Sequence, residues 1–199
     1  YNADSKAPTP NIDRLAREGV RFTDAHAPAA VCVPTRYGLM TGRYPFRMKG
    51  GRGPLIAADR LTVAKLLQQQ GYRTGMVGKW HLGVEHEKDP QPNQILSGGP
   101  AQRGFNSFFG IPASLDIPPY YYIRGDRAVA PPSLKIDASD TEGWTRIQGA
   151  FWREGGIAPG YHHEEVLPKF AEEAASFLND SSRGPFFLYL ALPAPHTPW

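Results

Sequence analysis

Hydrophobic residues recur at helical spacing in several stretches of this chain, and each stretch is bounded by residue types that begin or end helices. In the first stretch, Thr9 can cap a helix N-terminus, Pro10 suits the first helical position and Gly19 follows the last turn. This pattern predicts a helix whose Ile12 and Leu15 side chains face inward.

A second helical stretch begins after Thr62, which can cap it, and ends at Gly71. The residues that follow helical spacing there are Val63, Leu66, Leu67 and Gln70. A third stretch covers Glu164–Leu178, and Pro168 should perturb its early part. One side of this third helix carries Phe170, Ala174, Phe177 and Leu178.

Strand patterns follow the helices along the chain. We expect strands at Val20–Ala25 after the first helix and at Tyr72–Val77 after the second. After the Gly184-Pro185 break, the continuous apolar run Phe186–Leu192 is typical of a strand buried on both faces. The repeated order of helix and strand predicts an α/β fold with a mostly parallel sheet flanked by helices.

The region from about Glu85 to Tyr161 has a different character. It is rich in Pro, Gly and Tyr and shows no sustained periodicity. It predicts one hairpin, in which Tyr120–Arg124 and Arg127–Ala130 flank Gly125-Asp126. Long irregular stretches in a compact domain are often functional. Two interpretations stay open, a rim over an active site and a surface insertion.

Composition narrows the possible classes of protein. The chain has 199 residues, of which 41% are hydrophobic, enough for one domain with a core. The formal net charge is only +3, and basic and acidic residues alternate, which argues against nucleic-acid binding. No apolar run reaches the ~20 residues that a membrane-spanning helix needs.

The one cysteine of the chain, Cys32, is the first candidate for chemistry. It cannot form an internal disulfide, so it can be a nucleophile, a metal ligand, a site of modification or a small buried hydrophobe. Pro34 suits the first turn of a helix and Gly42 suits its end, so Cys32 is expected at a helix N-terminus. Unpaired N–H groups there favour anionic chemistry.

Other candidate side chains follow the predicted strands. Lys79 and His81 come after the strand that ends at Val77, and His196 comes after the last apolar run. In open α/β sheets the active crevice lies beyond the carboxyl ends of the strands. We therefore expect these residues to meet Cys32, although each alone could be a surface charge or a hydrogen-bonded core histidine.

Several motifs in order along the chain resemble those of the type I sulfatases, within the alkaline phosphatase superfamily. They are Thr9–Phe22, Cys32–Arg36 with Leu39–Arg43, Gly71–Gly83, Gly104-Phe105 with Gly110–Ser114, and Pro195–Pro198. Val33 and Thr35 depart from the commonest version of the signature, which has Thr and Ser there. The resemblance covers nearly the whole chain and implies the fold of an alkaline-phosphatase-like sulfatase catalytic domain.

The resemblance implies a specific chemistry for Cys32. In this family a formylglycine-generating enzyme oxidises the cysteine to Cα-formylglycine, which hydrates to a gem-diol. Helped by a divalent cation, usually Ca²⁺, one hydroxyl attacks sulfur and gives a covalent sulfo-enzyme. The second hydroxyl then allows sulfate to be expelled and the aldehyde to be regenerated. Cys32, as formylglycine, would itself be a metal ligand.

By the same resemblance, other residues acquire roles. Arg36 and His81 would orient the diol, with His81 the base for the elimination. Lys79 and His196 would bind sulfate, and His196 would also protonate the leaving oxygen. Ser114 resembles a serine that hydrogen-bonds in the site, although it could simply cap a loop. Positive groups are what cleavage of a charged sulfate ester requires.

The sequence also resembles an internal piece of a longer sulfatase. The family's Asp pair before the signature, and its Asp-Asn pair and Lys after the Pro-His-Thr-Pro region, are not in residues 1–199. We therefore expect the other Ca²⁺ ligands outside this chain, a partial catalytic domain over residues 1–199, and no activity from these residues alone. The expected substrate is a sulfated small molecule or carbohydrate, and export to the periplasm or the outside of the cell stays open.

Three alternatives remain at this point. A phosphonate monoester or phosphodiester hydrolase of the same superfamily can share the formylglycine motif. A thiol hydrolase could use unmodified Cys32 with His81 or His196 as its base. A degenerate relative could keep the fold without catalysis.

Overall fold

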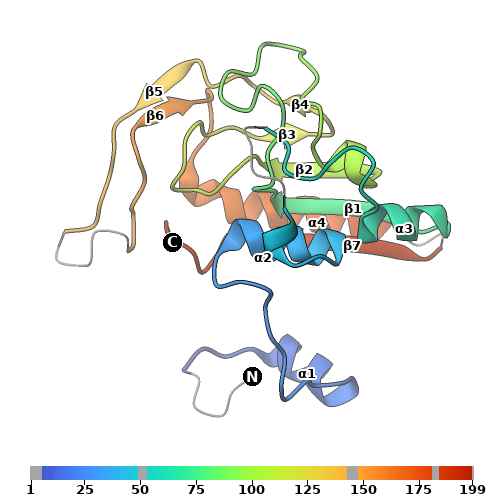
Figure 1. The fold of residues 1–199 in the computed structure, drawn as a ribbon. Coiled ribbons are helices and arrows are strands. Elements are labelled where there is room, and N and C mark those ends of the chain that lie inside the picture. Colours follow the sequence, from blue (N-terminus) through green and yellow to red (C-terminus); the bar gives the residue numbers. More distant parts are fainter. Residues whose placement is uncertain (1–5, 49–52, 143–147, 181–183, 199) are drawn as a thin grey trace.

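The computed structural model describes residues 6–48, 53–142, 148–180 and 184–198, and its centre is a five-stranded sheet of order β4-β3-β2-β1-β7 (Figure 1). The strands are β1 Arg73–Lys79, β2 Ser107–Ile111, β3 Ile123–Arg124, β4 Arg127–Ala128 and β7 Phe186–Ala191. Strand β1 pairs in parallel with both β2 and β7, whereas β2, β3 and β4 pair antiparallel. The expected α/β fold with a mostly parallel centre is confirmed.

The helices of the described residues differ in how they contact this sheet. They are α1 Pro10–Glu18, α2 Cys32–Thr41, α3 Val63–Gln69 and α4 Val166–Asp180, with short 3-10 turns η1 Pro45–Arg47, η2 Pro100–Arg103 and η3 His163–Glu165. Helix α4 contacts β1 and β2, α3 contacts β1, and α2 contacts α3. A glycine permits the close approach of α4, since a Cβ on Gly75 would stand 2.4 Å from the Phe177 ring. Among the described residues, no helix is both long and apolar enough to cross a membrane.

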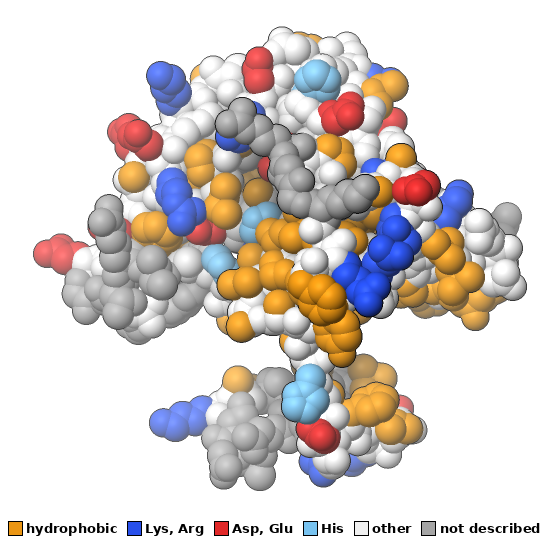
Figure 2. All heavy atoms as spheres, in the orientation of Figure 1, with side chains coloured by type: hydrophobic (Ala, Val, Ile, Leu, Met, Phe, Trp, Pro, Cys, Tyr) orange, Lys and Arg blue, Asp and Glu red, His pale blue; other side chains and the backbone are white. Residues whose placement is uncertain are grey.

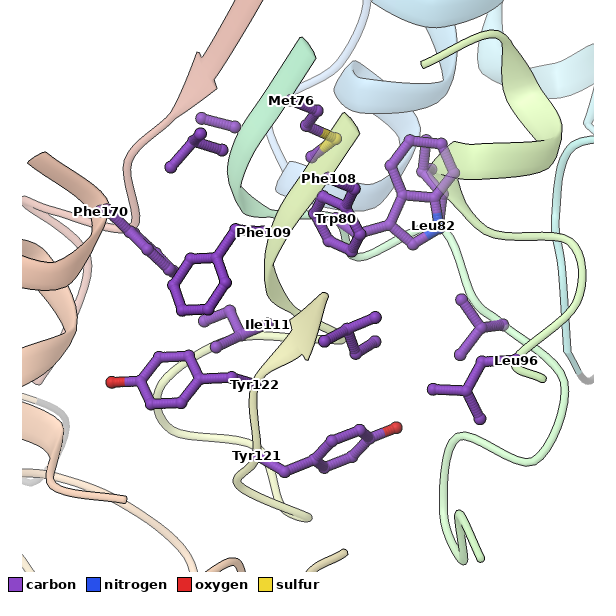
Figure 3. Packing of buried hydrophobic residues seen from close by; sticks show 14 of the residues in the cluster. Met76, Trp80, Leu82, Leu96, Phe108, Phe109, Ile111, Tyr121, Tyr122 and Phe170 are labelled. Atoms are coloured by element: carbon purple, nitrogen blue, oxygen red, sulfur yellow. The ribbon is translucent and has the colours of Figure 1, made fainter. Parts of the chain in front are cut away.

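Aromatic side chains fill the core between the sheet and α4. Phe109 of β2 stacks on Tyr122, with ring centroids 5.2 Å apart, and meets the edge of Phe170 at 6.1 Å (Figure 3). Trp80 and Leu82, just after β1, are also buried. The three consecutive tyrosines at 120–122 are all buried, so they are core residues and do not form an exposed stacking surface.

The N-terminal segment departs from expectation. Helix α1 forms where it was expected, but Ile12 and Leu15 are 58% and 66% exposed, so the prediction that they face inward is wrong. The strand expected at Val20–Ala25 is absent, and Phe22 is exposed. Figures 1 and 2 show α1 and its flanks standing away from the body on a narrow neck. A strand needs a pairing partner, and the described part of the chain places none beside this segment.

The final strand, β7, is also less buried than its apolar run suggests. It lies at the edge of the sheet with β1 as its neighbour, and Phe186 and Leu190 are each 43% exposed. The expectation of burial on both faces is therefore wrong. A continuous apolar run shows that both faces of a strand could be buried, but whether they are depends on the elements that pack beside the strand.

The middle region holds more regular structure than its composition predicted. The hairpin is confirmed, with Arg124 opposite Arg127, although its strands are short. Strand β2 was missed, because a five-residue segment ending Gly110-Ile111 carries little periodicity of its own. Two further strands, β5 Leu134–Ile136 and β6 Gly155–Ile157, form a separate small sheet. The expectation that residues 85–161 hold no regular structure besides one hairpin is therefore corrected.

Candidate active site

Cys32 is the first residue of α2, as its sequence context predicted. Val31 before it is extended, and the helix ends at Gly42 in a left-handed conformation, with φ 66°. The strand expected just before this loop is the absent Val20–Ala25 strand, so a segment without regular secondary structure leads into the helix. The partly buried thiol is in hydrogen-bonding contact with Lys79. The thiol thus lies between a helix N-terminus and a cation, both favourable to negative charge.

Arg36 lies one turn after Cys32, on the same face of α2. Its guanidinium donates a hydrogen bond to the backbone carbonyl of Lys79 and another, of 3.4 Å, to the hydroxyl of Tyr189 on β7. These contacts fix the guanidinium between β1 and β7. A planar group held at two points suits the orientation of oxygen atoms better than a flexible ammonium would.

Lys79 is the last residue of β1 and only 2% exposed. Its ammonium donates a 3.1 Å hydrogen bond to Ser114, which lies in the loop after β2. Burial lowers the pKa of Lys79, and Arg36 lowers it further, whereas Cys32 and Asp116 oppose the change. The strand was expected to end at Val77, and its two extra residues carry Lys79 to the carboxyl edge of the sheet.

His81 follows β1 in a left-handed backbone conformation, with φ 57°. Its backbone N–H donates a hydrogen bond to the carbonyl of Pro112. The buried Nδ1 of its imidazole ring has no hydrogen-bond partner among the described residues. Burial, then the charges of Lys79 and Arg36, lower the pKa of His81 to about 4. The imidazole is therefore neutral near pH 7, as a base must be before it accepts a proton.

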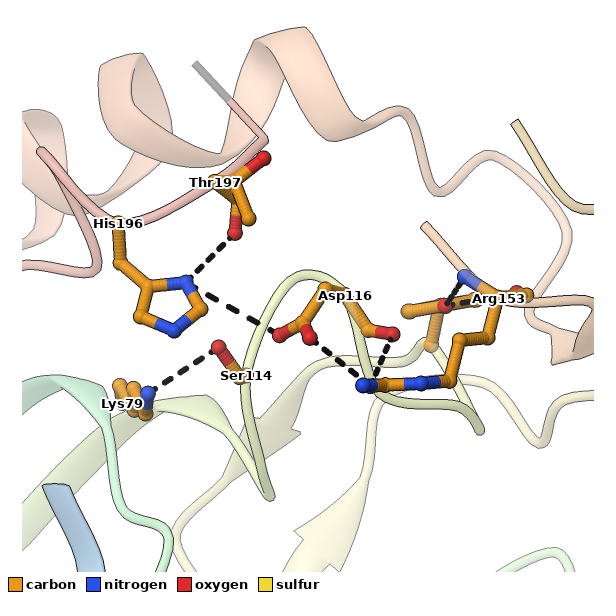
Figure 4. A network of polar contacts seen from close by, with 7 residues as sticks. Lys79, Ser114, Asp116, Arg153, His196 and Thr197 are labelled. Carbon is orange, nitrogen blue, oxygen red and sulfur yellow. Dashed lines mark hydrogen bonds and ion pairs between the residues drawn. The ribbon is translucent and has the colours of Figure 1, made fainter. Parts of the chain in front are cut away.

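His196 reaches the same place from the loop after β7 (Figure 4). Its Nδ1 lies 2.7 Å from the carbonyl oxygen of Thr197 and 4.0 Å from Oδ1 of Asp116. The side chain is partly exposed, unlike that of Lys79. All the residues singled out in the sequence are thus brought to one edge of the sheet.

The sequence did not point to Asp116, which is only 6% exposed. Its Oδ2 accepts a 2.8 Å hydrogen bond from Arg153, and its Oδ1 accepts no hydrogen bond from the described residues. Ser114 and Asp116 share one turn, closed by a bond from Ile117 N–H to the Ser114 carbonyl. An acidic residue two positions after a candidate serine was the available signal.

An open cleft of about 820 Å³ lies beside His81. Its lining residues are Val33, Gly53, Leu55, His81, Gly83, Val84, Glu85, His86, Glu87, Lys88 and Asp89. Its lining includes the apolar side chains of Val33 and Leu55 and the carboxylates of Glu85 and Asp89, and it has room for a sugar or aryl group. Residues 85–89, from the region for which a rim over the active site and a surface insertion were both left open, therefore border the candidate site.

The described residues do not form a metal site by themselves. Within them, no group of three or more His, Cys, Asp or Glu side chains is placed to hold a metal ion. Ca²⁺ prefers six to eight oxygen ligands. The residues present therefore do not fit a resident Ca²⁺ without ligands from elsewhere.

Comparison with known proteins gives a consistent result. The family model described as Sulfatase matches residues 1–199. The chain is 31% identical to the N-acetylgalactosamine-6-O-sulfatase of Bacteroides thetaiotaomicron over 98% of its length, and 36% identical to human arylsulfatase A over 96%. It spans only 44% and 37% of those two relatives.

Solved structures agree with the sequence comparison. A Bacteroides thetaiotaomicron protein, described with the metabolism of multiple glycosaminoglycans, matches with a TM-score of 0.76 and 30% identity, over 96% of this chain and 46% of that one. Ps i-CgsB in complex with k-i-k-neocarrahexaose matches with a TM-score of 0.60 and 28% identity, over 96% of this chain and 40% of that one.

Proposed function

The chain belongs to the sulfatase family, and we propose that the whole protein of which it forms a part hydrolyses a sulfate monoester. The observation that carries this proposal is the gathering of Arg36, Lys79, His81 and His196 around the N-terminus of the helix that begins with Cys32. A sulfate ester is a charged, weakly electrophilic centre, and fixed positive groups stabilise the charge that develops as its S–O bond breaks.

Within this proposal, Cys32 is the site of oxidation to formylglycine by a formylglycine-generating enzyme. The modified side chain would supply a gem-diol nucleophile that forms a covalent sulfo-enzyme and later releases sulfate. The environment of Cys32 supports this role, since the helix N-terminus and Lys79 both favour negative charge on the side chain. Ca²⁺ would need acidic ligands from other parts of the protein.

The remaining side chains have roles that follow from their contacts. Lys79, buried and held by Ser114, would bind the sulfate oxygens through a fixed charge. Arg36, fixed between β1 and β7, would orient the nucleophilic side chain one turn earlier on α2. Neutral His81 would accept the proton whose removal allows sulfate to leave.

His196 would protonate the departing alcohol oxygen. It is the most exposed of the charged or titratable groups in the cluster, which suits contact with the part of the substrate that differs between esters. A sugar alcohol is a poor leaving group, so its release requires such a proton. The same group, when protonated, would add to the positive charge around the sulfate.

A sulfated carbohydrate is the substrate class that we propose. One similar protein is an N-acetylgalactosamine-6-O-sulfatase, and another, Ps i-CgsB, is described in complex with k-i-k-neocarrahexaose. The cleft beside His81 has space for a sugar ring, and its Glu85 and Asp89 side chains can accept hydrogen bonds from hydroxyl groups.

The proposal is tested by turnover of matched esters by the full-length protein, co-expressed with a formylglycine-generating enzyme. We expect sulfate release from an aryl sulfate and from a 6-sulfated amino sugar, and much slower cleavage of an aryl phosphodiester. Preferential phosphodiester cleavage would favour the related phosphohydrolase class. No turnover of any ester would favour a non-catalytic relative.

A further inference from the structure

A buried carboxylate with one unused oxygen stands next to His196. Asp116 is 6% exposed, and Arg153 donates to its Oδ2 and to its backbone carbonyl. Its Oδ1 is buried and accepts no hydrogen bond from the described residues, yet it lies 4.0 Å from Nδ1 of His196. A buried acceptor without a hydrogen bond is destabilising, so such a group calls for an explanation.

The hydrogen bond to Thr197 fixes the tautomer of His196. A carbonyl oxygen can only accept, so the 2.7 Å contact requires that Nδ1 carry the hydrogen. In the neutral ring Nε2 then holds the lone pair, and in the protonated ring Nε2–H is the free donor. Figure 4 shows this second nitrogen on the side of the ring that faces Lys79 and Ser114.

The charges around Asp116 make it the acidic centre of a positive cluster. Its negative charge acts on Lys79 at the end of β1 and on His81 just after that strand. Arg153 approaches from the far side of the carboxylate (Figure 4). Arg153 thus anchors the carboxylate through Oδ2, whereas Oδ1 faces His196 and accepts no hydrogen bond from the described residues.

We propose that Asp116 is a positioning residue for His196: anchored by Arg153, its carboxylate acts together with the Thr197 carbonyl to hold the imidazole with Nδ1–H turned away from the reaction and Nε2 directed at the sulfate-binding side chains. This inference rests on the proposed function, in which His196 protonates the leaving oxygen. Orientation by a buried carboxylate is a general way to prepare an imidazole for proton transfer.

The test compares leaving groups in the full-length, modified enzyme. Asp116→Asn keeps the size of the side chain and removes its charge. We expect kcat for a 6-sulfated sugar to fall about 10- to 100-fold, with KM nearly unchanged and with a much smaller loss on nitrophenyl sulfate. In a His196→Ala background, Asp116→Asn should produce no further change in the ratio between the two substrates.

Arg153→Gln is the matched comparison, since it removes the anchor of the carboxylate and leaves Oδ1 beside His196. It should change the substrate ratio in the same direction as Asp116→Asn, but by less. Equal losses on both substrates in Asp116→Asn, or an unchanged sugar ester rate, would overturn the positioning role. Wild-type turnover of sulfate esters is the separate test of the proposed function, so the two failures are distinguishable.

A measurement on the unmutated protein covers the case in which Asp116→Asn does not fold. With ¹⁵N-labelled histidine, and His196→Ala for assignment, the nitrogen shifts of His196 report its tautomer. We expect neutral His196 to be protonated at Nδ1. Protonation at Nε2 would overturn the proposal, because the ring would then be held the other way round.

Discussion

The ammonium of Lys79 donates a 3.1 Å hydrogen bond to the hydroxyl of Ser114, although 35 positions separate the two residues in the sequence. They meet because β1 and β2 are parallel neighbours whose carboxyl ends lie at one edge of the sheet. The ammonium is almost fully buried, so its charge is costly unless anionic or polar groups surround it. A bound sulfate group would supply that charge.

Lys79→Met should therefore abolish most of the activity on every sulfate ester. The variant keeps the buried volume and removes the charge that would bind the group common to all substrates. We expect kcat/KM to fall about 10²- to 10³-fold on both aryl and sugar sulfates. Ser114→Ala, which removes the partner and keeps the charge, should cost less. A Lys79→Met enzyme with near wild-type kcat/KM would contradict the assignment.

His196→Ala should discriminate between leaving groups. A nitrophenolate leaves with little protonation, whereas a sugar alcohol needs a proton as its bond to sulfur breaks. We expect a loss of about 10²- to 10⁴-fold on the sugar ester and a clearly smaller loss on nitrophenyl sulfate, measured as kcat/KM. Equal losses on the two substrates would leave His196 with a sulfate-binding role only.

The lowered pKa of His81 predicts that the free energy of unfolding decreases as the pH falls below 6.5. Its pKa falls from 6.5 to about 4 on folding, because of burial and then the charges of Lys79 and Arg36. Above pH 6.5 the residue is neutral in both states and contributes no pH dependence. As the pH falls from 6.5 to 4, the unfolded chain binds the proton more readily, so the folded state loses up to about 3 kcal/mol.

The check is urea unfolding of the full-length protein at pH 7 and pH 4.5. Wild type should lose more stability between these pH values than His81→Gln, which cannot take up the proton. Identical losses in the two proteins would show that His81 is not buried in its neutral form.

The sequence predicted the parts of the fold that carry local signals. The caps and spacing of α3, the strand at β1 and the Gly125-Asp126 hairpin all form, because turn and capping residues act within a few positions. The sequence did not predict β2, nor the exposure of Ile12 on α1. Both depend on what packs beside a segment, which spacing along the chain does not record.

The candidate site divides in the same way. Lys79 and His196 could be named because each follows a predicted strand, and Cys32 because helix signals follow it, and the structure brings them together. Asp116 could not, because its position matters only through the folding of one turn beside His196 and Arg153. A buried, partly unpaired carboxylate is visible only in three dimensions.

Thr62 offers a test of the fold itself. Its hydroxyl accepts a 3.1 Å hydrogen bond from the N–H of Lys65 and donates a 2.6 Å bond to the carbonyl of Arg103, so it both caps α3 and ties it to η2. Thr62→Ala should lower the free energy of unfolding by about 1–2 kcal/mol. Thr62→Ser keeps the hydroxyl and should cost less. A variant as stable as wild type in urea would refute the capping role.

The central claim is that Cys32 becomes the catalytic aldehyde, and the mass of one tryptic peptide tests it most directly. Cleavage after Arg21 and Arg36 releases residues 22–36, which contain Cys32. In full-length protein that turns over sulfate esters, we expect the mass of this peptide to be lower by the difference between a thiol and an aldehyde side chain. We also expect the peptide to react with a hydrazide. An active preparation in which the peptide keeps an unmodified thiol would contradict the claim and favour a thiol hydrolase.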